Sequence, residues 1–443
     1  MSSLRNSFAA VCLAAVMLAW ACPEAAIAKS GGAFSLGNLF GSSSDTPAEQ
    51  DDAATLKAAQ AKADATLLDQ LTPTDLFISP EAAQRLEAAI ADYQRIAAAG
   101  GWPAIAKGTT LHPGDQDELV VTLRHHLFIT GDLAKAKGTW NFDEDVQAGL
   151  KRFQRRHGLL PNGVLEARTV YALNVSAEDR LTQLRVSLQR MRDFVGRGLP
   201  DRYVMVNIPA MELQAVDDGR IVIKSRTVVG RVERQTPGVA AKIQGLNFFP
   251  FWKVPESIAN KDLIAKMSKD PEYLTSEHIR VLAEPDGQEI DPHAIDWKQP
   301  LPMPVRFRQD PGDFNALGVV RIDMPNPDDV YMHDTPLKDL FRRATRNFSS
   351  GCVRVQRVLD LAAWIAGTNG DWDRARVDSV LQAGQAVDIK LKKPINVYFI
   401  YQTAWVDTEI GVAFRSDLYG RDGNDAASRE TSADAAPTPS LSP

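Results

Sequence analysis

Cysteine is scarce in this chain: only three of its 443 residues are cysteines, and Cys12 and Cys22 lie close to the N-terminus. Cys352 is the one cysteine in the rest of the chain, so it has no partner for an intramolecular disulfide. It lies in the run SSGCVR, downstream of His333. A buried structural thiol is one interpretation. A small-Gly-Cys-x-Arg run with an upstream histidine favours the other, a thiol nucleophile.

The sequence also lacks the patterns that bind metals and nucleotides. Its seven histidines are scattered, and no CxxC, HExxH or Gly-rich phosphate loop occurs. We therefore expect no metal and no cofactor. The net charge of −6 comes without a polybasic cluster, which argues against nucleic acid as a partner. Beyond the N-terminus no stretch reaches about 18 uncharged apolar residues, so the mature chain is not expected to span a membrane.

Residues 1–28 have the features of a secretory signal peptide. A positively charged start precedes an uncharged apolar core at residues 8–20, and Ala26-Ile27-Ala28 gives the small-x-small pattern of a cleavage site. A lipoprotein signal ending at Cys22 fits less well, because Trp20 puts a bulky ring where a small residue is expected. We therefore expect an exported protein that is cleaved after residue 28.

Both ends of the mature chain are predicted to be disordered. Residues 29–64 form a linker rich in Gly, Ser, Ala and Asp, and the tail at 421–443 has a similar composition. Residues 65–113 are predicted as a helical scaffold segment that ends at a Gly-Gly-Trp-Pro stop. Its helical spacing is carried by four apolar residues: Leu86, Ile90, Tyr93 and Ile96.

Residues 114–176 are predicted as a three-helix module, followed by a linking helix at 177–200. Two stripes of apolar residues mark its first two helices: Val120, Leu123 and Leu127, then Phe142, Val146, Leu150 and Phe153. Its FQ…GL…G…T element resembles the type 1 peptidoglycan-binding domain, although Asn162 stands where that family usually carries Asp. The resemblance implies binding to the cell wall. A helical spacer without a ligand site is the alternative.

From residue 201 to about 420 the sequence predicts a mainly antiparallel β domain, which makes the whole chain an α+β multidomain protein. Asp217-Asp218-Gly219 is a hairpin turn signal between two strands. Alternating and β-branched residues place the strands at 203–208, 212–216, 221–229, 319–324, 330–333, 387–391 and 395–401. Segments 403–406 and 412–414 are expected to pair and to close this domain.

Four segments of the β region together resemble the catalytic domain of the L,D-transpeptidases. They are VNIP at 206–209, Gly230 with Thr236-Pro237, YMHDTP at 331–336 and FSSGCVR at 348–354. The resemblance covers about residues 201–402. It is closest to the large periplasmic members that combine a helical scaffold, a peptidoglycan-binding module and a capping insertion. It therefore implies a periplasmic enzyme and a target of carbapenems.

The resemblance also implies the reaction. The donor is a tetrapeptide stem of peptidoglycan that loses D-Ala, and the acceptor is the side-chain amine of a second stem, so that a 3-3 cross-link forms. Alternatives are attachment of an outer-membrane lipoprotein, hydrolysis of such links, or a catalytically idle wall-binding protein. The intact pair of His333 and Cys352 argues against the idle protein.

Cys352 and His333 are the catalytic candidates. Cys352 would form a thioester acyl-enzyme, and His333, with a pKa near 6.5, would move protons to and from the reacting groups. Gly351 allows a sharp turn, and the N–H groups of Gly351 and Cys352 are candidates for an oxyanion site. A helix predicted at 355–365 would lower the pKa of the thiol just before it.

Four neighbours complete the candidate site. Ser350 and Tyr331 are substrate-binding candidates, although an alternate strand residue such as Tyr331 is often core. Arg354 either binds a substrate carboxylate or braces the loop. Asp334 is expected to cap a helix that begins at Pro336. Between the strands, residues 254–304 carry a helix at 258–269 and turns, which we interpret as a cap that excludes water.

Overall fold

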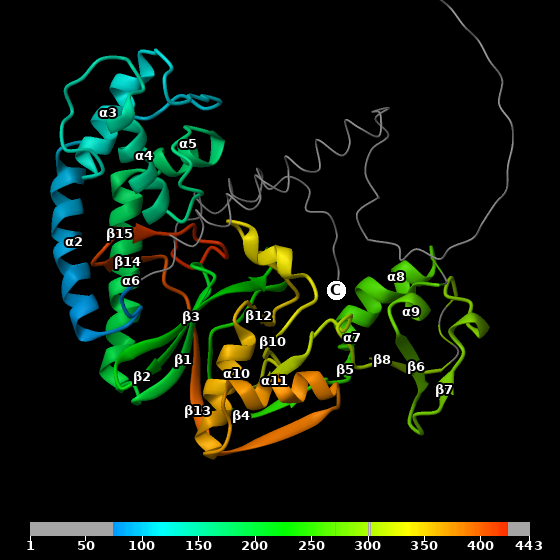
Figure 1. The fold of residues 1–443 in the computed structure, drawn as a ribbon. Coiled ribbons are helices and arrows are strands. Elements are labelled where there is room, and N and C mark those ends of the chain that lie inside the picture. Colours follow the sequence, from blue (N-terminus) through cyan, green and yellow to red (C-terminus); the bar gives the residue numbers. More distant parts are fainter. Residues whose placement is uncertain (1–73, 271, 300, 302, 424–443) are drawn as a thin grey trace, which may run out of the picture. The chain divides into compact units, whose positions relative to one another are not determined.

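The computed structural model describes residues 74–423 except 271, 300 and 302. The predicted signal peptide and linker, and the part of the predicted tail after Gly423, lie outside the described residues. Within the described part, none of the helices has the length and apolar character needed to cross a membrane. A helical region is followed by a β-rich domain, as Figure 1 shows, so the predicted fold class is confirmed.

Two long helices form the scaffold. Helix α2 (Pro80–Ala98) begins with Ser79, whose side chain accepts from the Ala82 N–H, and α6 (Ala177–Arg197) is capped in the same way by Ser176. Their apolar faces share one core with the hairpin formed by β14 (Ala404–Asp407) and β15 (Gly411–Phe414). The hairpin itself was predicted, but its expected role was wrong: it forms a separate sheet and does not join the large one.

The three predicted helices of the module are present as α3 (Leu119–Ile129), α4 (Glu144–Arg156) and α5 (Ala167–Leu173). Both apolar stripes of the sequence lie in one buried core. Arg156 forms a buried ion pair with Asp132 and also donates to the carbonyl oxygen of Val412 in β15 (3.1 Å). The module is thereby tied to the C-terminal hairpin.

A nine-stranded sheet forms the centre of the β domain, in the order β11-β3-β12-β10-β9-β4-β13-β1-β2. An additional β2–β3 pairing closes this order on itself. Most neighbours are antiparallel, while β11–β3, β12–β10 and β13–β1 are parallel. The strands are β1 (Arg202–Asn207), β2 (Glu212–Asp217), β3 (Arg220–Gly230), β4 (Val239–Phe248), β9 (Val320–Asp323), β10 (Met332–His333), β11 (Asn347–Ser349), β12 (Val353–Val355) and β13 (Val387–Ile400).

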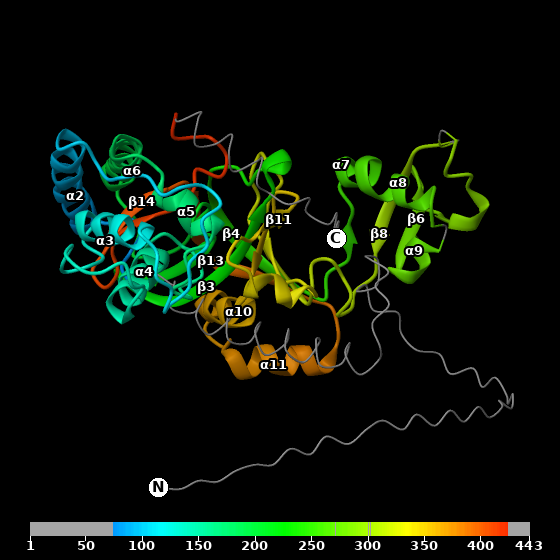
Figure 2. The same ribbon diagram turned by 90° about the horizontal axis from the view of Figure 1, so that it is seen from above.

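The core of this domain is completed by α10 (Val358–Ala366) and α11 (Arg374–Ala383), which lie side by side in Figures 1 and 2. The helix predicted at 355–365 therefore begins later, at Val358, because Val353–Val355 is a strand. Short 3-10 turns occupy Val232–Arg234 (η1), Pro292–Ala294 (η3), Lys338–Arg342 (η4) and Gly367–Asn369 (η5).

The insertion between β4 and β9 is a small folded unit with a core of its own. The predicted helix is present as α7 (Glu256–Ile258), a π-helical turn η2 (Ala259–Leu263) and α8 (Ile264–Met267), followed by α9 (Tyr273–Ser276). Its sheet was not predicted from the sequence. Four strands pair in the order β5-β8-β6-β7, namely β5 (Trp252–Lys253), β8 (Val305–Gln309), β6 (Ile279–Ala283) and β7 (Glu289–Ile290).

Candidate active site

One face of the β10–β12 pair brings the candidate residues together. The strands are parallel, with Met332 opposite Val353 and His333 opposite Arg354, and the Val353 N–H donates to the Tyr331 carbonyl (3.0 Å). Met332 and Val353 are fully buried in the core. Because side chains alternate along strands, Tyr331, His333, Cys352 and Arg354 lie on the opposite face. Four residues from two separate sequence motifs thus share one surface.

The turn that precedes β12 holds Cys352 in place. Gly351 has a φ of +124°, a conformation that other residues rarely adopt. The hydroxyl of Ser349 donates to the Cys352 carbonyl (2.6 Å) and accepts from the Gly351 N–H (3.2 Å). On the other side, the Thr236 hydroxyl donates to the Gly351 carbonyl (2.8 Å). Side-chain hydroxyls therefore fix the turn from both sides.

The expected lowering of the Cys352 pKa is wrong. Burial raises the pKa of the thiol, although hydrogen bonds from Tyr331 and the positive charges of Arg354 and Arg321 oppose this effect. The physical reason is that strand β12 separates Cys352 from α10, so the thiol is not at the N-terminus of that helix. In the resting protein Cys352 is a neutral thiol at neutral pH.

The expected pKa of His333 near 6.5 is also wrong. The side chain is buried, and burial together with the charge of Arg354 lowers its pKa to about 3, against a hydrogen bond with the Asp334 backbone. Its Nδ1 atom is buried and has no hydrogen-bond partner in the described part of the chain. His333 is therefore a neutral imidazole with a ring nitrogen free to accept a proton.

Arg354 is a buried cation beside the thiol. Its residue is 5% exposed, its Nε atom has no hydrogen-bond partner among the described residues, and burial lowers its pKa to about 10. No carboxylate or backbone carbonyl pairs with Arg354 in the described part of the chain, in contrast to the bracing role that was one of its two interpretations. A buried guanidinium without a counter-ion is costly unless an anionic group meets it.

Ser350 and Tyr331, two neighbours of Cys352, contact other parts of the catalytic domain. The Ser350 hydroxyl accepts from Arg234 (3.0 Å) and from Arg231 (3.3 Å). The ring of Tyr331 stands edge-to-face to the imidazole of His333, with centroids 5.6 Å apart, and burial raises the pKa of its phenol. Tyr331 also packs against the cluster of Trp252 and Ile258 where the insertion begins.

Asp334 does not have the predicted capping role. The 3-10 turn that follows Asp334 begins at Lys338, and its N-cap position is occupied by Leu337. Asp334 instead accepts from the Val319 N–H (3.1 Å) and pairs with Lys338. The Asp334 carboxylate thus links the end of β10 to the segment that enters β9.

Comparison with known proteins identifies this domain. The family model described as L,D-transpeptidase catalytic domain matches residues 201–389, and that described as "Putative peptidoglycan binding domain" matches residues 116–173. The chain carries an L,D-transpeptidase catalytic domain behind a peptidoglycan-binding domain. The family resemblance inferred from the sequence motifs is confirmed.

A curated protein of Haemophilus influenzae, named "Putative L,D-transpeptidase", is 36% identical to this chain over 251 residues. The match covers 56% of this chain and 50% of that protein, so the chain spans about half the length of this relative. Among solved structures, an L,D-transpeptidase from Stackebrandtia nassauensis has a TM-score of 0.24 and 13% identity, covering 67% of this chain and 97% of that one. Another from Mycobacterium smegmatis has a TM-score of 0.22 and 12% identity, covering 44% and 58%. The assignment rests on the sequence matches.

Sequence reasoning missed two features of the catalytic domain's surroundings. Arg234 forms an ion pair with Asp262 of the insertion (2.5 Å) while it also contacts Ser350. Tyr419, outside every motif, contacts both ends of the turn between β3 and β4. No local pattern could have revealed either, because the partners are distant in sequence.

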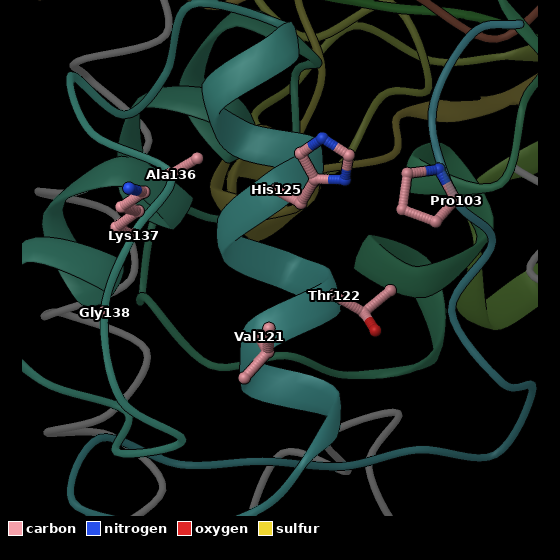
Figure 3. A pocket seen from close by; sticks show the side chains of 7 residues that line it. All are labelled: Pro103, Val121, Thr122, His125, Ala136, Lys137 and Gly138. Carbon is pink, nitrogen blue, oxygen red and sulfur yellow. The ribbon is translucent and has the colours of Figure 1, made fainter.

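Two cavities of the described chain lie away from this site. One, of about 500 Å³, is in the peptidoglycan-binding domain, where Val121, Thr122 and His125 of α3 face Lys137 and Pro103 (Figure 3). The other, of about 1030 Å³, lies between α2, that domain and β15. Neither is lined by Cys352 or His333. No group of metal-ligating side chains occurs in the described residues.

The two pKa directions predict an unusual pH profile for acylation of Cys352 by a β-lactam. His333 stays neutral at every pH above about 3, so the base is not lost on mild acidification. The thiol ionises only above its ordinary range, because burial raises its pKa. The second-order rate of adduct formation should therefore be flat between about pH 5 and 8 and rise in alkali. A change in this rate with a midpoint near pH 6.5 would contradict the prediction. The variant His333→Gln should lose the flat region of the profile.

Proposed function

We propose that this protein is a periplasmic peptidoglycan L,D-transpeptidase that forms 3-3 cross-links through a thioester on Cys352. The observation that carries the proposal is the common face of β10 and β12, on which Cys352, His333 and Arg354 meet inside an L,D-transpeptidase catalytic domain. The peptidoglycan-binding domain supports a substrate in the cell wall. The stem peptides are its donor and acceptor.

The proposed chemistry begins from a neutral thiol and a neutral imidazole. The thiol proton moves to Nδ1 of His333 as the sulfur attacks the carbonyl carbon before the terminal D-Ala. The imidazolium returns this proton to the leaving amine, D-Ala departs, and a thioester remains. The acceptor amine then attacks the thioester, gives a proton to His333, and the expelled sulfur takes it back. Because burial disfavours the imidazolium, each protonated state of His333 is short-lived.

Arg354 and its neighbours give the site a positive field. Arg354 lacks an anionic partner among the described residues, and Arg231 and Arg234 converge on Ser350. Peptidoglycan stems carry free carboxylates, which a planar guanidinium binds through paired hydrogen bonds. We assign Arg354 to a donor carboxylate, and Ser350 and Tyr331 to the wall of the same groove.

For the oxyanion site we assign the Cys352 N–H ahead of the Gly351 N–H. The Gly351 N–H already donates to the Ser349 hydroxyl at 3.2 Å. An oxyanion donor must be free to meet the developing charge of the tetrahedral intermediate. The turn therefore supports one backbone donor next to the nucleophile.

The insertion is proposed as the cap of this site. Its α7–η2 segment reaches the catalytic loop through the Asp262–Arg234–Ser350 contacts. Its base at Trp252 packs on Tyr331. Transfer of the acyl group to an amine requires that water be kept from the thioester, and a folded cover near the nucleophile supplies that.

Two other products are compatible with the same acyl-enzyme. Transfer to an outer-membrane lipoprotein, or hydrolysis, would use the same Cys352 and His333. Analysis of muropeptides from cells with and without the protein decides among them. Loss of 3-3 dimers supports the proposal, whereas loss of lipoprotein-linked stems alone would replace it with the lipoprotein reaction.

A carbapenem should form one covalent adduct with this protein. The strained lactam carbonyl is an acyl donor for the same thiol, and the adduct should be absent from Cys352→Ala and formed much more slowly by His333→Ala. Intact-protein mass spectrometry of the wild type and both variants measures this directly. An adduct on Cys352→Ala would place the nucleophile elsewhere.

A further inference from the structure

The C-terminal segment after β15 contacts the turn between β3 and β4 through Tyr419 and through Arg421, which donates to the Gln235 side chain (2.9 Å) and to the Thr236 carbonyl (3.2 Å). Tyr419 is 9% exposed, and its hydroxyl donates to the Gly230 carbonyl (2.6 Å) and accepts from the Thr236 N–H (3.2 Å). Gly230 ends β3 and Thr236 precedes β4, so the single hydroxyl joins both ends of the turn between these strands. The backbone is tight here: a Cβ atom on Gly230 would lie 2.2 Å from the Arg234 carbonyl oxygen.

Thr236 links this turn to the residue before Cys352. Its side chain is fully buried, and its hydroxyl accepts from the Gly230 N–H (2.8 Å) and donates to the Gly351 carbonyl (2.8 Å). The single proton of the hydroxyl is thereby used on the Gly351 carbonyl. The Gly351 carbonyl belongs to the peptide bond whose other half is the Cys352 N–H. Tyr419 and Thr236 thus form a continuous set of contacts that ends at that peptide.

The direction of the Cys352 N–H follows from this contact. In a planar trans peptide the C=O and N–H bonds point in opposite directions, so a held Gly351 carbonyl also holds the Cys352 N–H. Gly351, at a φ of +124°, gives the peptide little restraint of its own. A hydrogen bond to the carbonyl also polarises the peptide and strengthens its N–H as a donor. Thr236 therefore orients the group assigned above to the oxyanion.

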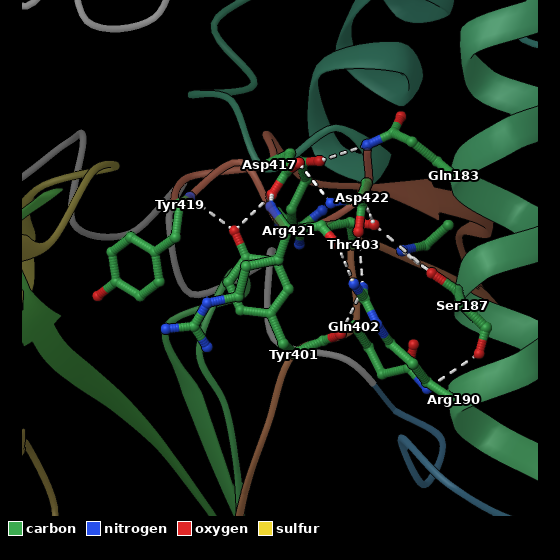
Figure 4. Close-up of polar contacts among 12 residues, drawn as sticks. Gln183, Ser187, Arg190, Tyr401, Gln402, Thr403, Asp417, Tyr419, Arg421 and Asp422 are labelled. Carbon is green, nitrogen blue, oxygen red and sulfur yellow. Dashed lines mark hydrogen bonds and ion pairs between the residues drawn. The ribbon is translucent and has the colours of Figure 1, made fainter. Parts of the chain in front are cut away.

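Tyr419 is itself held from the scaffold, as Figure 4 shows. Its N–H donates to the Tyr401 hydroxyl (2.7 Å), which donates to Asp417 (2.6 Å). Asp417 accepts from the N–H of Asp422 (2.8 Å), and Asp422 pairs with Arg190 of α6 (2.6 Å). Arg421 and Asp422 lie in the range that the sequence predicted as tail, yet both are hydrogen-bonded. All of these C-terminal residues lie beyond the 201–389 match to the catalytic domain.

We propose that Tyr419 is a positioning residue for the oxyanion donor of Cys352, acting through Thr236. This inference rests on the proposed function, because the oxyanion exists only if Cys352 is acylated. Tyr419 does not touch the substrate. It fixes the turn from which the Thr236 hydroxyl orients the Gly351–Cys352 peptide.

The test compares variants that keep the shape of each side chain. Tyr419→Phe removes only the hydroxyl, and Thr236→Val removes its counterpart, while Thr236→Ser keeps the hydroxyl and loses a methyl group. Acylation by a carbapenem is followed by mass spectrometry over a range of inhibitor concentrations, which separates the maximal rate from the half-saturating concentration. Tyr203→Phe is the matched control, because this buried tyrosine of β1 packs on Tyr398 in another part of the sheet.

We expect Tyr419→Phe to lower the maximal acylation rate by about tenfold, a part of the 10²–10³ that one oxyanion donor contributes in comparable enzymes. The half-saturating concentration should stay within about twofold. Thr236→Val should be at least as slow, Thr236→Ser should recover most of the rate, and Tyr203→Phe should match the wild type. Because both residues act on one peptide, the double variant Tyr419→Phe/Thr236→Val should be no slower than Thr236→Val alone.

Three outcomes would overturn the inference. A maximal rate of Tyr419→Phe equal to the wild type would show that the hydroxyl has no effect on the reaction. Multiplying effects in the double variant would show that Tyr419 does not act through Thr236. A Thr236→Ser variant as slow as Thr236→Val would assign the effect to packing. If the wild type itself forms no adduct, the proposed function falls as well, whereas the first three results leave it standing.

Discussion

Replacing Cys352 with alanine should abolish both cross-linking and acylation while the protein remains folded. Cys352 has no disulfide partner and is only half-buried, so the loss of its sulfur should change the free energy of unfolding by no more than about 1 kcal/mol. The proposed reaction, in contrast, loses the one thiol of the described residues. Removal of a nucleophile that acts together with its base typically costs several orders of magnitude, so we expect a loss of about 10³-fold or more.

Serine at this position should be nearly as inactive. The lowered pKa of His333 makes it a weak base in the resting protein, and an alcohol is a far weaker acid than a thiol. Turnover of a defined tetrapeptide donor, with the melting temperature as the test of folding, checks both variants. Thr408→Ser, an exposed substitution that keeps the hydroxyl, serves as the control for effects of mutagenesis and purification. A folded Cys352→Ala variant with substantial transpeptidation would refute the assignment of the nucleophile.

The parts of the structure that were predictable from sequence depend on local signals. Alternating residues and the Asp217-Asp218-Gly219 turn specify the β2–β3 hairpin without any distant contact, and the spacing of Leu86, Ile90 and Tyr93 predicts α2. The two motifs around His333 and Cys352 could be recognised for the same reason. That they share a face required the parallel pairing of β10 with β12, which only the fold provides.

The errors have a common physical origin. The pKa values of Cys352 and His333 depend on burial, which the sequence around them does not report. The insertion was taken for a helix with turns because its strands are short and pair across long separations, as β5 does with β8. Tyr419 and Asp262 gained their roles in the same way, through contacts with residues far along the chain.

Removing the insertion should separate acylation from productive transfer. The structure suggests a better cut than the predicted boundaries of 254–304, because Lys253 of β5 pairs directly with Arg308 of β8. Replacing residues 254–307 with Asn-Gly would join these two residues by a two-residue turn, which antiparallel strands favour. The core of the insertion leaves as a whole, so the nine-stranded sheet should keep its packing.

In this deletion variant Cys352, His333 and Arg354 remain, and a small β-lactam should still acylate the thiol. Water should gain access to the thioester, because Asp262 no longer links the insertion to Arg234 and Trp252 loses its Ile258 neighbour. We expect the ratio of cross-linked to hydrolysed product from a tetrapeptide donor to fall by about tenfold, equivalent to ~1.4 kcal/mol in relative barrier height.

The point variant Asp262→Asn tests the ion pair with Arg234 separately from the insertion as a whole. It keeps the whole insertion and the hydrogen bond between Arg234 and Ser350, but it removes the charge that pairs with Arg234. If closure depends on this ion pair, Asp262→Asn should lower the product ratio part of the way toward that of the deletion variant. High salt should lower the ratio of the wild type, because screening weakens the same pair. An unchanged ratio in a stably folded deletion variant would mean that the insertion does not exclude water, since the thioester would then be equally protected without it.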